Sequence, residues 1–308
     1  MKPILLKTGA QPGGRPPAAV EITPEGVLAA ALPAPGGQPA YAYQPLAPGA
    51  ILPGIGEPNL RAPETVAEAI RSTLSQVSPR TRAVTLVLPD TVVRVFVLDF
   101  DSLPSKPAEA FPVLRFRLRK MVPFEVEHAG LSYQVLTENR NECKVLAAVL
   151  PGPVLAEYEA AVRAAGYEPG AVLPSSLAAL ETVDSMEAVL IANLSPLSLT
   201  TSIASGQNLL LYRTLDLPDD SALRGDEVRR GVAVAAAYFE DKLGMKATRL
   251  HFAGSTPGAG SSAETFERWL SDPTLSVVEL TPRPSTGAVT PLGTANIAGV
   301  AGALAGVR

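Results

Sequence analysis

The chain has 308 residues, of which 46% are hydrophobic and 18% are charged, and its formal net charge at pH 7 is −4. This length and composition are typical of a folded protein with room for two domains, and they exclude a disordered tail. A small negative charge without a sustained run of Lys or Arg gives no electrostatic basis for binding nucleic acid.

Cysteine and histidine are scarce, with one cysteine, Cys143, and two histidines, His128 and His251, in unrelated segments. A single cysteine excludes a disulfide framework, and these histidines lack metal-ligand spacing, so we expect no metal site. Residues 1–7 hold too few apolar side chains for a signal peptide, and no apolar run is long enough to span a bilayer. We therefore expect a soluble cytoplasmic protein.

A three-strand meander, a helix and a further strand open the folded part of the chain. Apolar and β-branched residues bounded by turn residues predict strands at 18–23, 27–32 and 40–43, a helix near 63–77 and a strand at 83–88. The same order returns about 170 residues later, with strands at 188–194, 199–203 and 209–213, a helix near 224–243 and a strand at 248–253. This repeat predicts two similar lobes that face one cleft.

The first lobe also contains a segment that has no counterpart in the second. The pattern there predicts a strand at 92–98, a helix near 107–121 and strands near 131–137 and 143–149, which form a β-α-β-β subdomain. A helix near 153–165, a strand at 171–173 and a short helix at 175–182 then return to the first lobe, while a helix at 261–270, a strand at 276–280 and a helix at 294–307 close the second. We expect a flexible arm at 1–16, a first lobe at 17–90 and 151–184, an inserted subdomain at 91–150 and a second lobe at 185–308.

Five short stretches carry a family resemblance, and they occur in family order. They are Leu88-Pro89-Asp90-Thr91-Val92-Val93-Arg94, Phe116-Arg117-Leu118-Arg119-Lys120-Met121-Val122-Pro123-Phe124-Glu125, Tyr133-Gln134-Val135-Leu136, Ala164-Ala165-Gly166-Tyr167-Glu168-Pro169 and Gly299-Val300-Ala301-Gly302-Ala303-Leu304. Two lobes with an insertion in the first resemble the cell-division protein FtsA, and the stretches resemble the PilM family, the cytoplasmic component of the type IV pilus assembly platform. The cytoplasmic part of the type II secretion protein GspL is also similar. The resemblance implies an α/β fold with two actin-like (ribonuclease H-like) lobes facing a cleft.

The same resemblance implies a nucleotide site, but the two hairpins that should hold the phosphates have changed. Glu21 stands where the family has Asp, Thr23 stands where it has Gly, and Pro24 removes one more backbone N–H donor. In the second hairpin, Pro196 and Leu197 stand where backbone N–H groups should face a phosphate. We therefore expect a degenerate nucleotide site.

The half of the nucleotide site that contacts the nucleoside is better preserved. Gly254 and Ser255 follow a strand, as in the adenosine-contacting turn of the superfamily, and Glu227 lies on the helix that supplies a ribose contact. With Glu21, these are the expected nucleotide-binding residues of the degenerate site. We expect no catalytic residue, no metal and no cofactor beyond weak binding of ATP or ADP.

A dinucleotide site is an alternative interpretation of one glycine-rich stretch. Residues 258–263 fit a Gly-x-Gly-x-x-Ala fingerprint between a strand and a helix, and Glu279 ends the next strand. The turn before the motif is too long, and no second βαβ half follows it. We therefore favour the actin-like interpretation.

The resemblance implies that the first lobe and the inserted subdomain hold the cytoplasmic tail of a PilN-like inner-membrane protein as an extended peptide. The residues expected to line this groove are Arg94, Phe96, Arg117, Lys120, Val122, Pro123 and Phe124. Alternation along 92–98 places Arg94, Phe96 and Leu98 on one face of the strand, and this face is either the groove or simply the core face. The basic run at 115–120 is, by itself, more typical of a solvated helix face.

Two functions from different classes follow from these observations. The first is a scaffold of a pilus or related secretion platform that reaches the membrane only through its partner, with self-association left open. The second is an active actin-like ATPase or small-molecule kinase that uses the interlobe cleft, for which Glu21 would orient metal and nucleophile.

Overall fold

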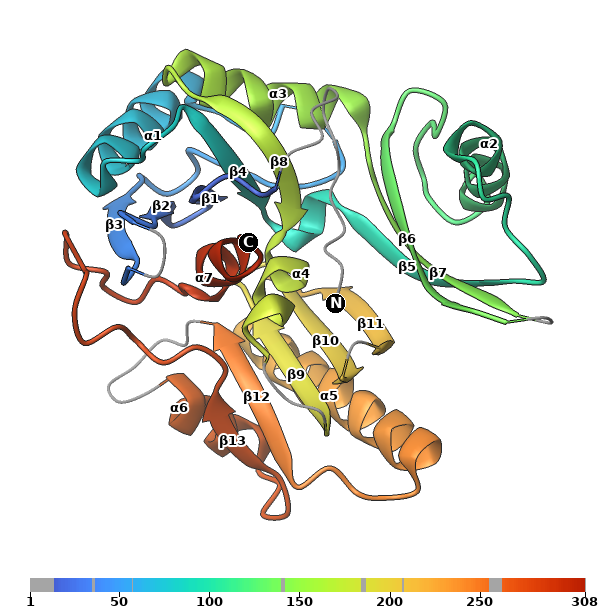
Figure 1. Cartoon of the computed structure of the whole chain (residues 1–308). Helices are drawn as coiled ribbons and strands as arrows, with labels where there is room; N and C mark the ends of the chain where they lie inside the picture. Colours follow the sequence, from blue (N-terminus) through green and yellow to red (C-terminus); the bar gives the residue numbers. More distant parts are fainter. Residues whose placement is uncertain are drawn as a thin grey trace.

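Two five-stranded sheets with the same topology form the centre of the molecule (Figure 1). The computed structural model describes residues 14–34, 37–56, 58–139, 142–183, 187–206, 208–254 and 262–307. The first sheet contains β1 (Ala18–Thr23), β2 (Gly26–Ala31), β3 (Ala40–Pro45), β4 (Ala83–Leu88) and β8 (Glu168–Pro174), in the order β3-β2-β1-β4-β8. The second contains β9 (Ala188–Leu194), β10 (Ser198–Ser205), β11 (Asn208–Asp216), β12 (Arg249–Gly254) and β13 (Ser276–Glu279), in the order β11-β10-β9-β12-β13.

Strand directions also match between the two sheets. In each lobe the first three strands form an antiparallel meander, and the next strand pairs in parallel with the first of them. The repeated pattern of the sequence thus corresponds to two lobes of one topology. The expected α/β fold with two similar lobes is confirmed.

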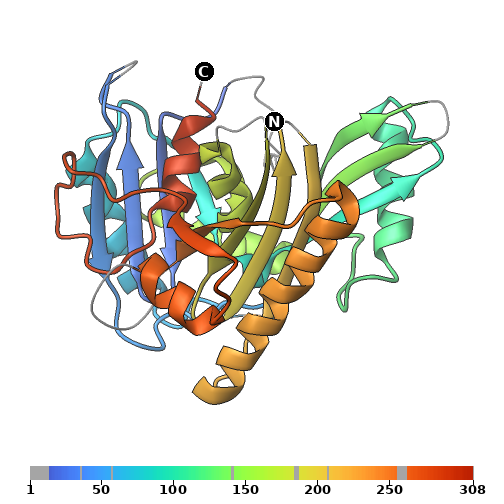
Figure 2. The ribbon, with the colours of Figure 1, turned by 90° about the horizontal axis from the view of Figure 1, so that it is seen from below.

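The helices cover the sheets in layers. α1 (Pro63–Val77) and α3 (Gly152–Ala164) pack on one face of the first sheet, while α4 (Ser175–Ala179) lies on the other. α5 (Ser221–Leu243) and α6 (Ser262–Leu270) pack together on one face of the second sheet (Figure 2). No helix among the described residues combines the length and the hydropathy needed to cross a bilayer.

The sequence of α1 explains where the helix begins, which face it buries and where it ends. Pro63 stands at its first turn, where proline costs no hydrogen bond, and Val66, Ile70 and Leu74 recur at helical spacing on its buried face. The helix stops at Ser78, whose φ of 49° is left-handed and lets its N–H bond the carbonyl of Leu74. Burying this apolar face against the first sheet is what holds α1 in place.

The insertion is a three-stranded antiparallel sheet with one helix, as the pattern predicted. β5 (Arg94–Phe100), β6 (Gly130–Glu138) and β7 (Cys143–Leu150) lie in the order β5-β7-β6, and α2 (Pro107–Leu118) packs on one face. β5 begins two residues later than expected because Asp90–Val92 form a 3-10 turn. α2 ends three residues earlier, where residues 119–121 turn away from the helix.

The two faces of β5 have different neighbours. Leu98 is buried under α2 and Phe96 packs against the same cluster, so this face is the core face of the subdomain. On the opposite face, Val95 and Val97 belong to the apolar cluster that includes Leu209 of β11, a strand of the second lobe. The insertion is therefore packed against the second lobe as well as covalently attached to the first.

The C-terminal helix lies on a different lobe from the one expected. We assigned residues 294–307 to the second lobe, but α7 (Ala298–Ala305) packs on the first sheet beside α4 (Figure 1). If α7 packed on the second lobe, the second face of β1 and β2, which carries Ala19, Leu28 and Ala30, would be exposed to solvent. Small side chains along α7 allow this close approach.

The edge of the first sheet is also covered by a C-terminal segment. Tyr41 of β3 forms a parallel bridge with Ala288: its N–H donates to the carbonyl of Gly287 at 2.8 Å, and its carbonyl accepts from Val289 at 2.8 Å. These hydrogen bonds pair backbone groups at the outer edge of β3 that would otherwise lack a protein partner.

Replacing Gly302 tests the packing of α7. A β-carbon at Gly302 would collide with the carbonyl group of Ala178 in α4, so Gly302→Ala is expected to lower the free energy of unfolding by at least about 2 kcal/mol. In a free helix the same change would stabilise by about 1 kcal/mol. Urea unfolding measures the difference, with the exposed Ala305→Gly as the matched control, expected to cost only about 1 kcal/mol. A Gly302→Ala variant as stable as the wild type would contradict this packing.

Candidate functional site

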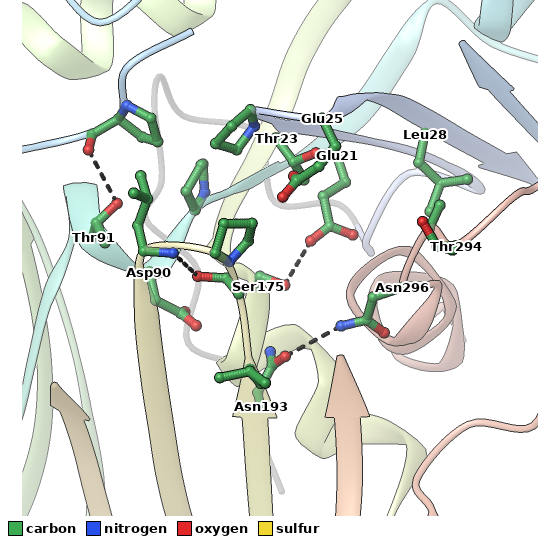
Figure 3. A pocket seen from close by; sticks show the side chains of 18 of the residues that line it. Glu21, Thr23, Glu25, Leu28, Asp90, Thr91, Ser175, Asn193, Thr294 and Asn296 are labelled. Atoms are coloured by element: carbon green, nitrogen blue, oxygen red, sulfur yellow. Dashed lines mark hydrogen bonds between the residues drawn. The ribbon is translucent and has the colours of Figure 1, made fainter. Parts of the chain in front are cut away.

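A cavity of about 80 Å³ lies where the two lobes meet, between the turns of their first hairpins (Figure 3). The first lobe contributes residues 23–25 and 89–91, and the second contributes residues 193–197. Three carboxyl groups line it, those of Glu21, Glu25 and Asp90, and no Lys, Arg or His occurs among the described residues of its lining. The cavity is thus acidic, with largely apolar walls.

Glu21 reaches the cavity because strand alternation turns it to the face of β1 that α7 covers. Its side chain is buried, Ser175 donates a hydrogen bond of 2.6 Å to Oε1, and the start of α7 lies against the carboxyl group at Gly299. Burial raises the pKa of Glu21 to about 7; the hydrogen bond from Ser175 opposes this rise, and the charges of Asp90 and Glu25 add to it. This carboxyl group therefore takes up a proton at a higher pH than an exposed glutamate does.

Asp90 connects the two lobes. It follows β4 of the first lobe and accepts hydrogen bonds from the backbone N–H of Ser176 at 3.0 Å and from the Ser176 hydroxyl. From the second lobe, Thr200 of β10 donates at 3.1 Å and Tyr212 of β11 at 3.4 Å. Burial raises the pKa of Asp90, and the hydrogen bonds from Ser176, Thr200 and Tyr212 oppose that rise.

Two asparagines extend this network to α7. Asn193 at the end of β9 donates to the Ser176 hydroxyl at 2.8 Å, and Asn296 donates to the Asn193 side chain at 3.2 Å (Figure 3). The Asn296 side chain in turn accepts from the N–H of Ala298, the first residue of α7. Polar side chains thus link both hairpins to the helix that closes the first lobe.

The expected nucleotide-binding residues are only partly brought together. Glu21 lines the cavity, and Gly254 ends β12 beside Leu194, which also lines it. Glu227 is not part of the lining; it lies on α5 and forms an ion pair of 2.7 Å with Arg230. Ser255, and the glycine-rich stretch up to residue 261, lie outside the described residues.

Among the residues expected to bind the partner, Arg94 has an interlobe position. Its side chain donates to the carbonyl of Thr91 at 3.0 Å and lies 3.6 Å from the carboxylate of Asp216 on β11. Arg94 therefore sits at the base of the insertion, where the insertion meets the second lobe.

The other expected partner-binding residues divide into a core group and a surface group. Phe96, Val122 and Phe124 pack in the apolar cluster beneath α2, whereas Arg117, Lys120 and Pro123 are exposed. The core group stabilises the subdomain, and the surface group remains available to a partner.

Several solved structures have a fold similar to that of this chain. The chain matches one in the PilM-PilN type IV pilus biogenesis complex with a TM-score of 0.75 and 19% identity, covering 96% of this chain and 100% of that one. A Bacteroides thetaiotaomicron protein with actin-like ATPase fold and unknown function matches with a TM-score of 0.50 and 9% identity, covering 88% of this chain and 94% of that one. The chain has the actin-like ATPase fold.

A protein of a secretion system also has a similar structure. The cytoplasmic domain of EpsL, an inner membrane component of the type II secretion system of Vibrio cholerae, matches with a TM-score of 0.50 and 14% identity, covering 87% of this chain and 89% of that one. No protein-family model and no curated protein matches the sequence. The resemblance to the PilM family is confirmed at the level of the fold.

Sequence reasoning missed two features of this actin-like chain. One is the role of Asp90, for which the available signal is the run Thr200-Thr201-Ser202, three consecutive polar residues in a strand that is buried apart from its last residue. The other is Phe116 on α2, which is 69% exposed and is not among the residues expected to bind the partner. An exposed phenylalanine one residue before an exposed arginine is a signal for a docking surface.

The raised pKa of Glu21 predicts a pH-dependent gain in stability for Glu21→Gln. A carboxyl group whose pKa is about 7 in the folded protein, against an ordinary value of 4.5 in the unfolded chain, contributes stability that is complete below pH 4.5 and is lost as pH rises through 7. Glutamine resembles the protonated form at every pH, so its advantage over the wild type is expected to grow from under about 1 kcal/mol at pH 5 to about 3 kcal/mol at pH 8.5. Urea unfolding at both pH values measures this, with Glu240→Gln, at an exposed position of α5 outside the cavity, as control. A constant difference between Glu21→Gln and the wild type would show that Glu21 titrates normally.

Proposed function

We propose that the chain is a scaffold of a type IV pilus assembly platform, that it binds the cytoplasmic tail of a PilN-like inner-membrane protein, and that it does not turn over ATP. The observation that carries this proposal is the fold match to the PilM-PilN complex, which extends over 96% of this chain, including the insertion. Through such a partner a chain of this kind would work at the inner membrane from the cytoplasmic side.

The outer surface of α2 supports a binding role. Val113, Phe116 and Arg117 lie at helical spacing on α2, and Lys120 follows in the turn after the helix. All four side chains are exposed; we call this surface the α2 patch. Arg119, by contrast, is paired with Glu127. The patch therefore offers an aromatic anchor beside two cations, Arg117 and Lys120, that form no ion pair with the described residues, a combination common at the energetic centre of protein interfaces.

The chemistry of the interlobe cavity supports a scaffold rather than an ATPase. A metal-bound triphosphate needs basic side chains or backbone N–H groups to hold its phosphates, and carboxylates to hold its metal. Pro24 and Pro196 occupy the two turns and lack N–H groups, and the described lining contains no cation. Burial raises the pKa of Glu21, which disfavours the charged form that a metal needs, and among the described residues no three acidic, His or Cys side chains form a metal cluster. These residues do not fit a magnesium-nucleotide.

Changes in the α2 patch are expected to weaken tail binding. Phe116→Ala removes an exposed apolar anchor and Arg117→Glu reverses a charge, so each should raise the Kd for the partner's tail about tenfold. Fluorescence anisotropy with a labelled synthetic peptide of the PilN-like tail measures this, with circular dichroism to check folding. Leu223→Ala, at an exposed leucine of α5, is the matched control and should leave Kd unchanged. Equal affinities in all four proteins would place the tail elsewhere.

ATP hydrolysis is expected to be absent. We expect phosphate release from MgATP to stay at the level of a protein-free blank, because both hairpin turns carry a proline and the described lining of the cavity contains no cation for the phosphates. A malachite-green assay of the purified chain, alone and with the tail peptide, checks this. Magnesium-dependent hydrolysis that disappears in Glu21→Ala would instead establish the alternative, an active actin-like ATPase or small-molecule kinase.

A further inference from the structure

A second hollow lies on the first lobe, away from the interlobe cavity. It is formed by Arg71 of α1, residues 79–82 before β4, and residues 165–167 after α3; it is open to solvent and has a volume of about 530 Å³. We call it the arginine basin, because Arg71, Arg80 and Arg82 all line it. β4 starts beside the basin at Ala83 and ends just before Asp90, so the basin and the cavity lie at opposite ends of one strand.

Two of the three guanidinium groups are held in place by the end of α3. Arg71 donates through Nη2 to the carbonyl of Ala164 at 2.9 Å, and Arg82 donates through Nη1 to the carbonyl of Gly166 at 2.8 Å. These bonds satisfy carbonyls at the end of α3, which is a structural role. Each guanidinium carries five N–H donors, so most of them remain free to meet a ligand without further ordering of the side chain.

Arg80 has no such structural role. Its side chain is exposed, and within the described part of the chain it forms no hydrogen bond or ion pair. Stabilisation of the fold therefore does not explain why a third arginine lies in this hollow.

The charge of the basin is only partly neutralised. Glu68 pairs with Arg71, whereas the nearby Glu159 and Glu168 both pair with Arg163, outside the basin. Three guanidinium groups against one carboxylate leave an excess of two positive charges on a protein whose net charge is −4. A local excess of this sign and size attracts a doubly charged anion.

We propose that the arginine basin binds a phosphate monoester group, carried either by a phospholipid headgroup or by a soluble phosphate ester. Guanidinium groups bind phosphate oxygens with paired, charge-assisted hydrogen bonds, and a phosphate monoester carries about −1.5 to −2 charges at pH 7, which matches the excess in the basin. Tyr167 and Pro79 supply a wall against which the rest of such a ligand can pack. The site is independent of both the α2 patch and the interlobe cavity, so it can be tested whether or not the chain binds a pilus partner.

The first arm of the test uses soluble phosphates. Inorganic phosphate and glycerol 3-phosphate are titrated into the full chain at constant ionic strength, and binding is followed by isothermal calorimetry. Arg80→Gln should weaken binding about tenfold, because it removes one charged donor group. Glu68→Gln should strengthen it several-fold, because Glu68 is the one carboxylate among the described residues that pairs with an arginine of the basin. Arg61→Gln, next to the opposite end of α1, is the matched control and should bind as the wild type does.

The second arm distinguishes the two sources of phosphate. Sedimentation is measured with vesicles of phosphatidylcholine alone, with added phosphatidic acid, whose headgroup is a phosphate monoester, or with added phosphatidylserine. Arg80-dependent binding to phosphatidic acid vesicles identifies a lipid ligand, and binding to soluble phosphates alone identifies a soluble ester. Failure to bind either, or binding that is the same in Arg80→Gln and Glu68→Gln as in the wild type, would overturn the proposal. Equal binding to phosphatidylserine and phosphatidic acid that does not depend on Arg80 would overturn it too.

Discussion

The buried carboxyl group of Asp90 fixes how the two lobes of the protein meet. Its oxygens accept hydrogen bonds from Ser176 in the first lobe and from Thr200 and Tyr212 in the second. Rotating one lobe against the other would leave these buried groups without partners, at a cost of about 1–3 kcal/mol each. The lobe arrangement, the small volume of the cavity and the position of α7 all depend on this one cluster.

The insertion provides a second connection between the lobes. Apolar residues of β5 pack into the same cluster as residues of β11, and Arg94 approaches Asp216 at the edge of that contact. The ion pair is largely exposed and contributes only about 0–1 kcal/mol, so the apolar contact is the stronger of the two. A chain joined at both places holds the insertion in a fixed position relative to both lobes.

The sequence predicted local elements well and tertiary contacts poorly. Alternating apolar residues and turn residues such as Pro24 and Gly26 located both meanders, because neighbouring strands in a meander are also neighbours in the chain. The sequence of α7 is rich in Gly and Ala, so its side chains are small and apolar on every side of the helix. It therefore does not indicate which lobe α7 packs against. The hydrogen bonds of Asp90 join residues 110 and 122 positions apart, and no local pattern encodes such a distance.

The course of the C-terminal segment limits how the protein can be divided. The first sheet takes its edge cover from residues 287–289 and the cover of one face from α7, although both follow the second lobe in the chain. A fragment that ends at residue 184 would therefore expose an alanine-rich sheet face and an unpaired strand edge, which are the features that promote association between chains. We therefore expect the two lobes to unfold together, and we expect neither a proteolytic cut nor an expression boundary between them to leave a native first lobe.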